Sequence, residues 1–378
     1  MKRIFILCAV VLGAVSCNKT PQFTGPELFS AENFDSVIQG KPVSLYTLRN
    51  ANGMVVQVTN YGGIVTDAWV PARDGKPVNV VLGYPTLADY FVPENTFAAA
   101  ITGRYANRIA NGRFVLDDKE YSLPINNGPN TLHGGIVGFS KKVWDARPFT
   151  DMAGNEALEL VYVSPDGEEN FPGTLTTRVV YTVMADNQLR IDYTATTDAP
   201  TVLNLTSHAY FNLHGGDHKT SVNSHSLTLN ADTYTPTDST LIPLGEIASV
   251  EGTALDFRTP MTIGSRVMDA DSIFDYRDGY DHNYVIRRDS CGVVVCAAEV
   301  YEPSTGVQMT VLTDTPGIQF FTGKSRVQQD ETSPYYRSAF ALEAQNYPDA
   351  PNHENFPSAV LRPGETYTQT TIYAFSVK

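Results

Sequence analysis

Apolar residues recur at every second position along most of this chain, in short runs separated by turn residues. Val, Ile, Thr, Tyr and Phe are enriched in these runs, which is typical of β-strands that bury one face. The runs predict strands at 54–58, 78–82, 157–163, 175–184, 189–195, 202–213, 226–229, 284–287, 293–300, 307–312, 318–322, 340–345 and 366–377.

Tight turns separate the predicted strands. Asn52-Gly53, Asp74-Gly75 and Asp166-Gly167 are pairs that favour hairpins. No long window has helical periodicity, and at most 86–90 forms a single turn. We therefore predict an all-β protein, a large single-domain antiparallel β-sandwich over residues 41–378. Sheets of this size present a broad concave face that suits a saccharide cleft.

The first residues carry a different pattern. Two basic residues precede an uninterrupted apolar run over 4–15, and Ser16 closes the run before Cys17. A basic start, a short apolar stretch and a small-residue end are typical of a secretory signal peptide. Because the run is too short for a permanent membrane helix, we predict that residues 1–16 are a removable leader.

The residues at the end of this leader also favour lipid attachment. Ala-Val-Ser-Cys at 14–17 resembles a bacterial lipobox, in which Cys17 would become the lipid-bearing first residue. An ordinary signal peptide with an incidental cysteine is the alternative. Residues 17–40 are predicted to be a tether that leads into the first strand. The expected location is the bacterial cell envelope, facing the periplasm or the cell surface, with membrane contact only through the lipid.

Composition and charge exclude one class of partner. Of the 378 residues, 27 are basic and 41 acidic, so the formal net charge is −14. Such a surface repels phosphate backbones, which argues against nucleic-acid binding. A hydrophobic content of 42% with 18% charged residues is typical of a folded domain and not of a disordered chain.

Two cysteines lie beyond the leader and the lipobox. Cys291 and Cys296 flank Gly-Val-Val-Val, which is interpreted as one strand. Their odd separation would send the side chains to opposite faces, so a mutual disulfide is not expected. We predict two buried, unreactive thiols, and their spacing does not fit a metal site.

Polar clusters interrupt the predicted strands with residue types that carry chemistry. Four longer clusters lie at 103–112, 130–135, 204–213 and 340–350, and two shorter ones at 279–284 and 316–323. If 204–213 is extended, its polar residues share one face and its apolar residues the other, so that His208 points into solvent or a cleft. By the same alternation, Glu343 faces away from its apolar neighbours Leu342 and Ala344.

Taken together and in this order, the clusters are specific. The chain from about Gly53 to Ala374 resembles the aldose 1-epimerase (galactose mutarotase) family. The matching segments are the Asn-Gly-Met at 52–54, the segment around Arg108, Leu-His-Gly-Gly at 132–135, Ser-Pro-Asp-Gly-Glu at 164–168, His-Ala-Tyr-Phe-Asn-Leu at 208–213, Tyr-Asp-His at 280–282, the segment around Gln319 and Leu-Glu-Ala-Gln-Asn at 342–346.

The resemblance implies a galactose mutarotase-like supersandwich that interconverts the α and β anomers of free hexoses such as glucose and galactose. It implies no cofactor and no metal. The matching positions make Glu343 the base and His208 the acid, with His133 as a second histidine near the ring oxygen. Arg108 and Asp281 match residues that bind and orient the sugar. Asn107 and Gln319 match less decisive sugar contacts. Arg104 is predicted to be structural, as an exposed or bracing charge.

Two other functions stay open at this point. A glycoside hydrolase would need two carboxylates flanking the scissile bond, for which Asp281 and Glu343 are the candidates. A non-catalytic sugar-binding envelope lipoprotein would keep the polar and aromatic contacts without needing both His208 and Glu343. The preferred aldose and the oligomeric state do not follow from the sequence.

Overall fold

The computed structural model describes residues 25–92, 97–216, 219–267, 279–322 and 337–378. Within these ranges the protein is all-β, and its helical segments are short 3-10 turns. The turn at Leu87–Phe91 is closed by a capping box between Thr86 and Asp89, which confirms the single turn predicted there. The other 3-10 turns are Ala31–Asn33, Ala110–Gly112, Phe139–Lys141, Glu168–Asn170, Ile263–Ser265 and Ala350–Asn352.

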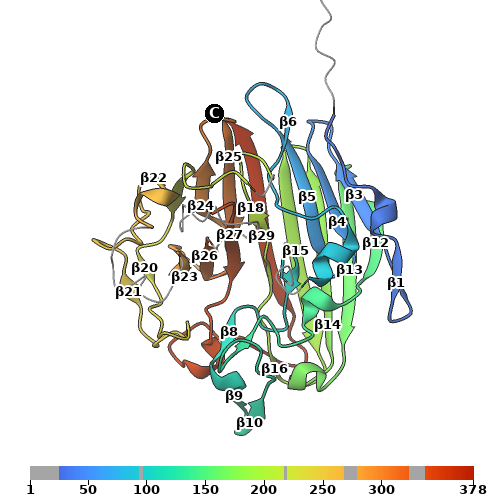
Figure 1. The fold of residues 1–378 in the computed structure, drawn as a ribbon. Coiled ribbons are helices and arrows are strands. Elements are labelled where there is room, and N and C mark those ends of the chain that lie inside the picture. The colour runs from blue at the N-terminus through green and yellow to red at the C-terminus, as the bar shows by residue number, and fades with distance from the viewer. Residues whose placement is uncertain (1–24, 93–96, 217–218, 268–278, 323–336) are drawn as a thin grey trace, which may run out of the picture.

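The largest sheet is antiparallel and runs through the whole molecule (Figure 1). Its strands in the described residues, in spatial order, are β12 (Asp145–Thr150), β13 (Glu156–Ser164), β14 (Leu175–Met184), β15 (Gln188–Thr197), β29 (Tyr367–Val377), β25 (Val307–Thr313), β24 (Val295–Tyr301), β19 (Ser226–Leu229) and β22 (Met261–Thr262).

Two smaller antiparallel sheets complete the sandwich. One contains β3 (Leu45–Arg49), β4 (Val55–Thr59), β5 (Ile64–Pro71) and β6 (Pro77–Asn79). The other contains β18 (Tyr210–Phe211), β27 (Phe340–Gln345), β26 (Gly317–Phe321), β23 (Asp281–Val285), β20 (Thr233–Tyr234) and β21 (Ala248–Ser249).

Short strand pairs connect these sheets. The pairs are β1 (Ser36–Ile38) with β2 (Lys41–Val43), β9 (Arg113–Leu116) with β10 (Lys119–Ser122), β8 (Arg108–Ile109) with β11 (Thr131–Leu132), β16 (Thr201–Val202) with β28 (Val360–Leu361), and β7 (Ile101–Thr102) with β17 (Thr206–Ser207).

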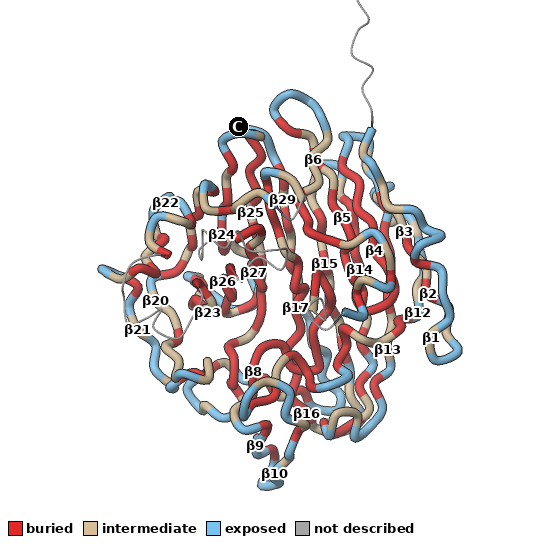
Figure 2. The backbone as a smooth tube through the Cα atoms, in the orientation of Figure 1, coloured by how far each residue is buried: buried red, intermediate tan, exposed pale blue. Residues whose placement is uncertain are grey.

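Both smaller sheets pack on the same side of the largest one. β3 contacts β13 and β14, and β5 contacts β29. The six-stranded sheet is joined to β29 by Tyr373, whose hydroxyl donates to the carbonyl of Leu342 and whose ring lies 4.8 Å from that of Phe211. Buried backbone therefore follows β14, β15, β29 and β27 through the middle of the molecule, whereas hairpin tips are exposed (Figure 2). The apolar face of each strand is used in this shared core.

The single strand predicted at 202–213 is wrong. The run at 202–213 forms three short strands that pair with different partners, β16 with β28, β17 with β7 and β18 with β27. The chain crosses between sheets here, and both of its faces are covered, so Asn204 and Leu205 are equally buried. Period-two alternation cannot separate core from cleft in a segment that is buried on both sides.

The prediction of two buried thiols is wrong for Cys291 and holds only in part for Cys296. Cys291 is exposed and Cys296 is partly buried, and neither forms a disulfide. β24 begins at Val295, so Cys291 lies in the preceding turn and not on the strand that the sequence predicted.

The N-terminal part of the described chain packs directly on the sandwich. Phe34 is fully buried in the main core, and β1 pairs with β2 through the turn at Gln39 and Gly40. Cys17 and the predicted leader lie outside the described residues. None of the helices that could be described has the length and apolar character needed to cross a membrane.

Candidate active site

The six-stranded sheet places a row of polar side chains on its outer face. Glu343 on β27 pairs with Gln319 on β26, which pairs with Asn283 on β23. Their neighbours Leu342 and Phe320 belong to the core on the other face. The predicted alternation around Glu343 is therefore confirmed, and the sheet turns this carboxylate away from the main core.

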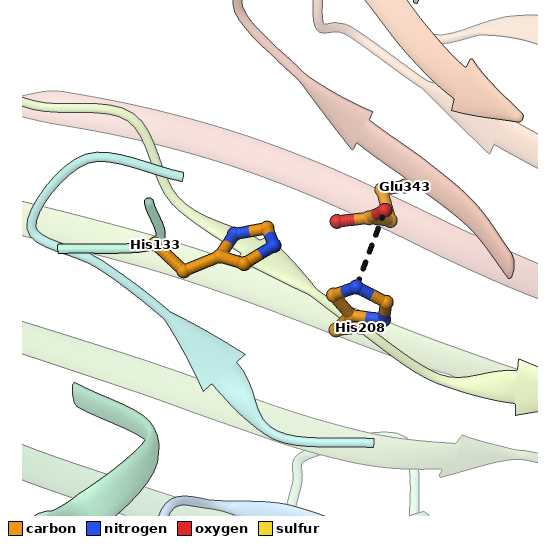
Figure 3. Close-up of side chains that lie close together, drawn as sticks. All are labelled: His133, His208 and Glu343. Atoms are coloured by element: carbon orange, nitrogen blue, oxygen red, sulfur yellow. Dashed lines mark ion pairs between the residues drawn. The ribbon is translucent and has the colours of Figure 1, made fainter. Parts of the chain in front are cut away.

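His208 comes to Glu343 from the irregular segment between β17 and β18. Its Nε2 lies 3.6 Å from Oε1 of Glu343, and both residues are nearly buried, at 5% and 2% exposed (Figure 3). The other oxygen, Oε2, is buried and accepts no hydrogen bond from the described residues. An imidazole and a carboxylate are thus adjacent, and one carboxylate oxygen has no hydrogen bond from the described residues.

His133 reaches the same point from the opposite wall. β11 pairs with β8 so that Leu132 stands opposite Arg108, and His133 follows directly. Its ring centroid is 5.1 Å from that of His208, and Figure 3 shows it aimed at the His208–Glu343 pair. Its Nδ1 accepts a hydrogen bond of 3.1 Å from the main-chain N–H of Asn107.

A chain of polar contacts continues from these residues across the sheet. Nε2 of Gln319 donates to Oδ1 of Asp281 at 2.5 Å, and Nη1 of Arg108 lies 3.8 Å from Oδ2 of Asp281. Oδ1 of Asn107 accepts from the main-chain N–H of Arg108 at 3.0 Å and from its Nη1 at 3.5 Å. The structure therefore brings all seven predicted catalytic and sugar-binding residues to one place.

Burial shifts the pKa values of Glu343 and His133 in opposite directions, because it disfavours the charged form of each group. Burial, together with the nearby Asp281 carboxylate, raises the pKa of Glu343 well above its usual value, and Arg108 opposes this shift. Burial, together with His208 and Arg108, lowers the pKa of His133 well below its usual value. Glu343 is therefore a carboxylate with raised proton affinity, whereas His133 is held neutral.

Several polar residues predicted to face the cleft serve the backbone instead. Asn204 donates to the carbonyls of Ala106 and Asn346, and Thr206 donates to the carbonyl of Ala344. Asn212 likewise donates to two main-chain carbonyls. These bonds hold the strands around Glu343 and His208, and the expectation of a continuous polar face on 204–213 is wrong.

Sequence reasoning missed three neighbours of the site. Oδ1 of Asn127 accepts from Nε of Arg108 at 3.2 Å. The ring of Phe321 lies 6.2 Å from that of His208, and the ring of Phe97 lies 4.7 Å from that of His133. Alternation from Gln319 could have found Phe321, because positions two apart on a strand share a face. For the other two the sequence carries no comparable signal.

Arg104 is the bracing charge that was predicted, although it is buried and not exposed. Its guanidinium donates to the hydroxyl and the carbonyl of Ser164 and to three further carbonyls, at Pro165, Pro172 and Gly173. Burial lowers the pKa of Arg104 to about 10, and the acids Glu168 and Asp166 oppose the shift. Arg104 thereby ties the segment before Asn107 to the turn after β13.

The three residues in Figure 3 also form a compact group of possible metal donors. One donor atom from each of His133, His208 and Glu343 lies within 4.8 Å of the other two. Among the described His, Cys, Asp and Glu side chains this is the group with such spacing. The group includes His208 and Glu343, the pair predicted to act as acid and base.

Comparison with known proteins decides the family. The sequence model described as aldose 1-epimerase matches residues 44–374. The chain is 41% identical over 326 residues to galactose mutarotase from Sus scrofa, covering 85% of this chain and 91% of the relative. It is 38% identical over 341 residues to aldose 1-epimerase from Escherichia coli K12, covering 89% and 96%.

The chain belongs to the aldose 1-epimerase family.

Solved structures of family members share its fold. Galactose 1-epimerase from Lactobacillus acidophilus NCFM superimposes with a TM-score of 0.78 at 28% identity, covering 91% of this chain and 97% of that one. An aldose epimerase homologue from C. elegans gives 0.76 at 29%, covering 89% and 99%. The predicted galactose mutarotase-like sandwich is thus confirmed for this member of the aldose 1-epimerase family.

Proposed function

We propose that this protein is an isomerase, an aldose 1-epimerase that interconverts the α and β anomers of free aldohexoses such as glucose and galactose. The observation that carries the proposal is the buried contact between Nε2 of His208 and Oε1 of Glu343, with His133 beside it. The relatives at about 40% identity are named galactose mutarotase and aldose 1-epimerase, which supports the same reaction.

The reaction needs one base and one acid close together. Anomers interconvert when the C1 hydroxyl loses its proton, the ring oxygen gains one and the bond between C1 and the ring oxygen breaks. The open aldehyde then rotates about the C1–C2 bond, and ring closure reverses both proton transfers. Because the two oxygens are attached to the same carbon, the acid and the base must be near neighbours, as His208 and Glu343 are.

Each residue of the site has a role in this scheme. Glu343 takes the proton from the C1 hydroxyl, and its raised pKa makes it a stronger base than an exposed carboxylate. His208 supplies the proton to the ring oxygen. Arg108 and Asp281 bind and orient the sugar hydroxyls. The remaining predicted contacts line the same site from two sides, with His133 and Asn107 on one wall and Gln319 beside Glu343 on the other.

The test is the loss of the base. Glu343→Gln keeps the shape of the side chain but cannot accept a proton, so we expect polarimetry on fresh α-D-glucose and α-D-galactose to show a loss of at least about 10²-fold. Circular dichroism should show an unchanged β-sandwich. Wild-type rates in this variant would contradict the assignment, and release of reducing sugar from a disaccharide by the wild type would point to a hydrolase.

We further propose that the chain is exported and anchored to the bacterial cell envelope through a lipid on Cys17. The proposal rests on the basic start, the apolar run over 4–15 and the Ala-Val-Ser-Cys at 14–17. It would place the aldose-binding sandwich in the periplasm or at the cell surface.

Metabolic labelling with a clickable fatty acid tests the anchor. Expressed in a bacterial host, the full chain should carry the label and sediment with membranes, whereas Cys17→Ser should be unlabelled. Cys291→Ser is the matched control and should remain labelled, because its thiol lies in the folded domain. An unlabelled wild-type chain would overturn the proposal.

A further inference from the structure

Two hydrogen bonds join Asn107 to His133. The main-chain N–H of Asn107 donates to Nδ1 of the His133 imidazole at 3.1 Å, and the main-chain N–H of His133 donates to the carbonyl of Asn107 at 2.9 Å. Both residues are nearly buried. The ring is therefore held at its Nδ1 side by the protein backbone, and its Nε2 side is left for the cleft.

This contact determines where the imidazole carries its hydrogen. A main-chain N–H can only donate, so Nδ1 of His133 must be the acceptor. A neutral imidazole has one acceptor nitrogen and one N–H, which places the hydrogen on Nε2. A doubly protonated ring would put two donors face to face at Nδ1. The lowered pKa of His133 agrees in direction with this geometry.

The local backbone explains why Asn107 can make the contact. Its φ is 64°, in the left-handed region that asparagine adopts more readily than most residues. His133 has a φ of 49° in the same region. The side chain of Asn107 is committed separately, because its Oδ1 accepts from Arg108. Asn107 therefore positions His133 with its main chain and Arg108 with its side chain.

We propose that Asn107 is a positioning residue that locks His133 as the neutral Nε2–H tautomer, so that His133 donates a hydrogen bond to a sugar oxygen and does not transfer a proton. The inference rests on the proposed function and deepens it. A preorganised neutral donor can stabilise charge that develops on an oxygen during ring opening.

The proposal separates the roles of the two histidines. The proton lost from the C1 hydroxyl goes to Glu343, and the proton gained by the ring oxygen comes from His208. The hydrogen on Nε2 of His133 is shared with the sugar oxygen and stays on the ring throughout. After ring closure reverses both transfers, all three side chains return to their initial state.

Nitrogen NMR on protein labelled with ¹⁵N-histidine tests the tautomer directly. In the wild type we expect Nδ1 of His133 to appear as a lone-pair nitrogen and Nε2 as a protonated one, unchanged across the neutral pH range. His133→Asn identifies the signals by their loss. A hydrogen on Nδ1, a mixture of tautomers or a neutral-range titration would overturn the inference.

Two substitutions at Asn107 test the positioning role. Asn107→Gly keeps the N–H and the positive φ, so the tautomer should persist while the KM rises because Arg108 loses an acceptor. Asn107→Val disfavours a positive φ, so the His133 signals should become a tautomer mixture. An unchanged tautomer in a folded Asn107→Val, or a lost one in Asn107→Gly, would contradict the proposal.

Kinetic measurements distinguish three roles for His133: hydrogen-bond donor, proton-transferring acid and purely structural residue. His133→Asn retains an acceptor for Asn107, but its amide is too short to place an N–H at the position of Nε2, so kcat should fall about 10²–10³-fold. His133→Gln places an amide N–H near the position of Nε2 and should recover about tenfold of that loss. His208→Gln should recover nothing relative to His208→Asn, because an amide cannot supply a proton. Wild-type activity in His133→Asn would leave only a structural role.

These readouts separate two kinds of failure. The tautomer is measured whether or not the protein mutarotates sugars. An inactive wild-type protein with His133 protonated on Nε2 would refute the proposed function alone. An active protein with His133 protonated on Nδ1 would refute the inference alone.

Discussion

Two buried histidine–glutamate pairs occur in the part of the chain that the structure describes, and their surroundings differ. Both oxygens of Glu302 accept hydrogen bonds, Oε2 from the hydroxyl of Ser224 at 3.0 Å and Oε1 from the main-chain N–H of Ser304 at 2.9 Å, and Nδ1 of His225 lies 3.1 Å from Oε2. Glu343, in contrast, has a buried oxygen without a hydrogen bond from the described residues. The Glu302 carboxylate is therefore committed to neighbouring protein groups, whereas one oxygen of Glu343 is left for a ligand.

A cost in stability follows from the position of Glu343. Its pKa is raised in the folded protein above the usual 4.5, so the folded state binds more protons than the unfolded state between these two values. Stability from this group is therefore complete below pH 4.5 and is lost as pH rises through the folded pKa. Each unit of pKa elevation corresponds to about 1.4 kcal/mol.

Removing the charge should therefore stabilise the fold. We expect Glu343→Gln to have a higher free energy of unfolding than the wild type, by a margin that grows as pH rises above 4.5. Urea unfolding at several pH values measures this difference. Glu299→Gln, the same substitution on an exposed position of β24, is the control. A margin at Glu343 that does not change with pH would contradict the argument.

At the scale of elements, the site is built by irregular segments held against one regular sheet. β26 and β27 place Gln319 and Glu343 by simple register. His208 and His133 come from chain crossings, where side-chain bonds to main-chain carbonyls replace the ladder of a strand. The buried guanidinium of Arg104 is part of this network, and it donates hydrogen bonds to Ser164 and to three main-chain carbonyls.

Loss of Arg104 should destabilise the protein and weaken sugar binding together. Arg104→Met would leave buried carbonyls without donors, and we expect a loss of about 3 kcal/mol in the free energy of unfolding. The segment to Asn107 and Arg108 would loosen, so KM should rise. The exposed Arg147→Met, which removes a surface ion pair with Glu159, should change stability by less than about 1 kcal/mol. Equal effects of the two variants would show that Arg104 is not a brace.

At the scale of the molecule, one core is shared by three sheets. Residues from β4, β14 and β27 belong to the same buried cluster, so the six-stranded sheet that bears Glu343 has no independent core. The positions of Glu343, Gln319 and Asn283 on this sheet therefore depend on the packing of the whole sandwich. This explains how nearly buried polar residues can be held within hydrogen-bond range of one another.

The sequence by itself determined the all-β class, part of the strands and the candidate residues that the structure brings together. Strands at 175–184, 226–229 and 340–345 match β14, β19 and β27 to the residue, because apolar alternation reports burial on one face. The site residues were found through a resemblance in the order of motifs, since no local pattern relates His133 to Glu343.

Only the tertiary structure decided which polar residues meet at the candidate site and which bond to the backbone. Asn204 and His208 have the same parity, yet one binds carbonyls and the other contacts Glu343. The tautomer of His133 likewise depends on a main-chain N–H 26 residues away in sequence. Contacts of this kind form between segments that meet only when the sandwich closes, and alternation along one segment does not encode the identity of its partner.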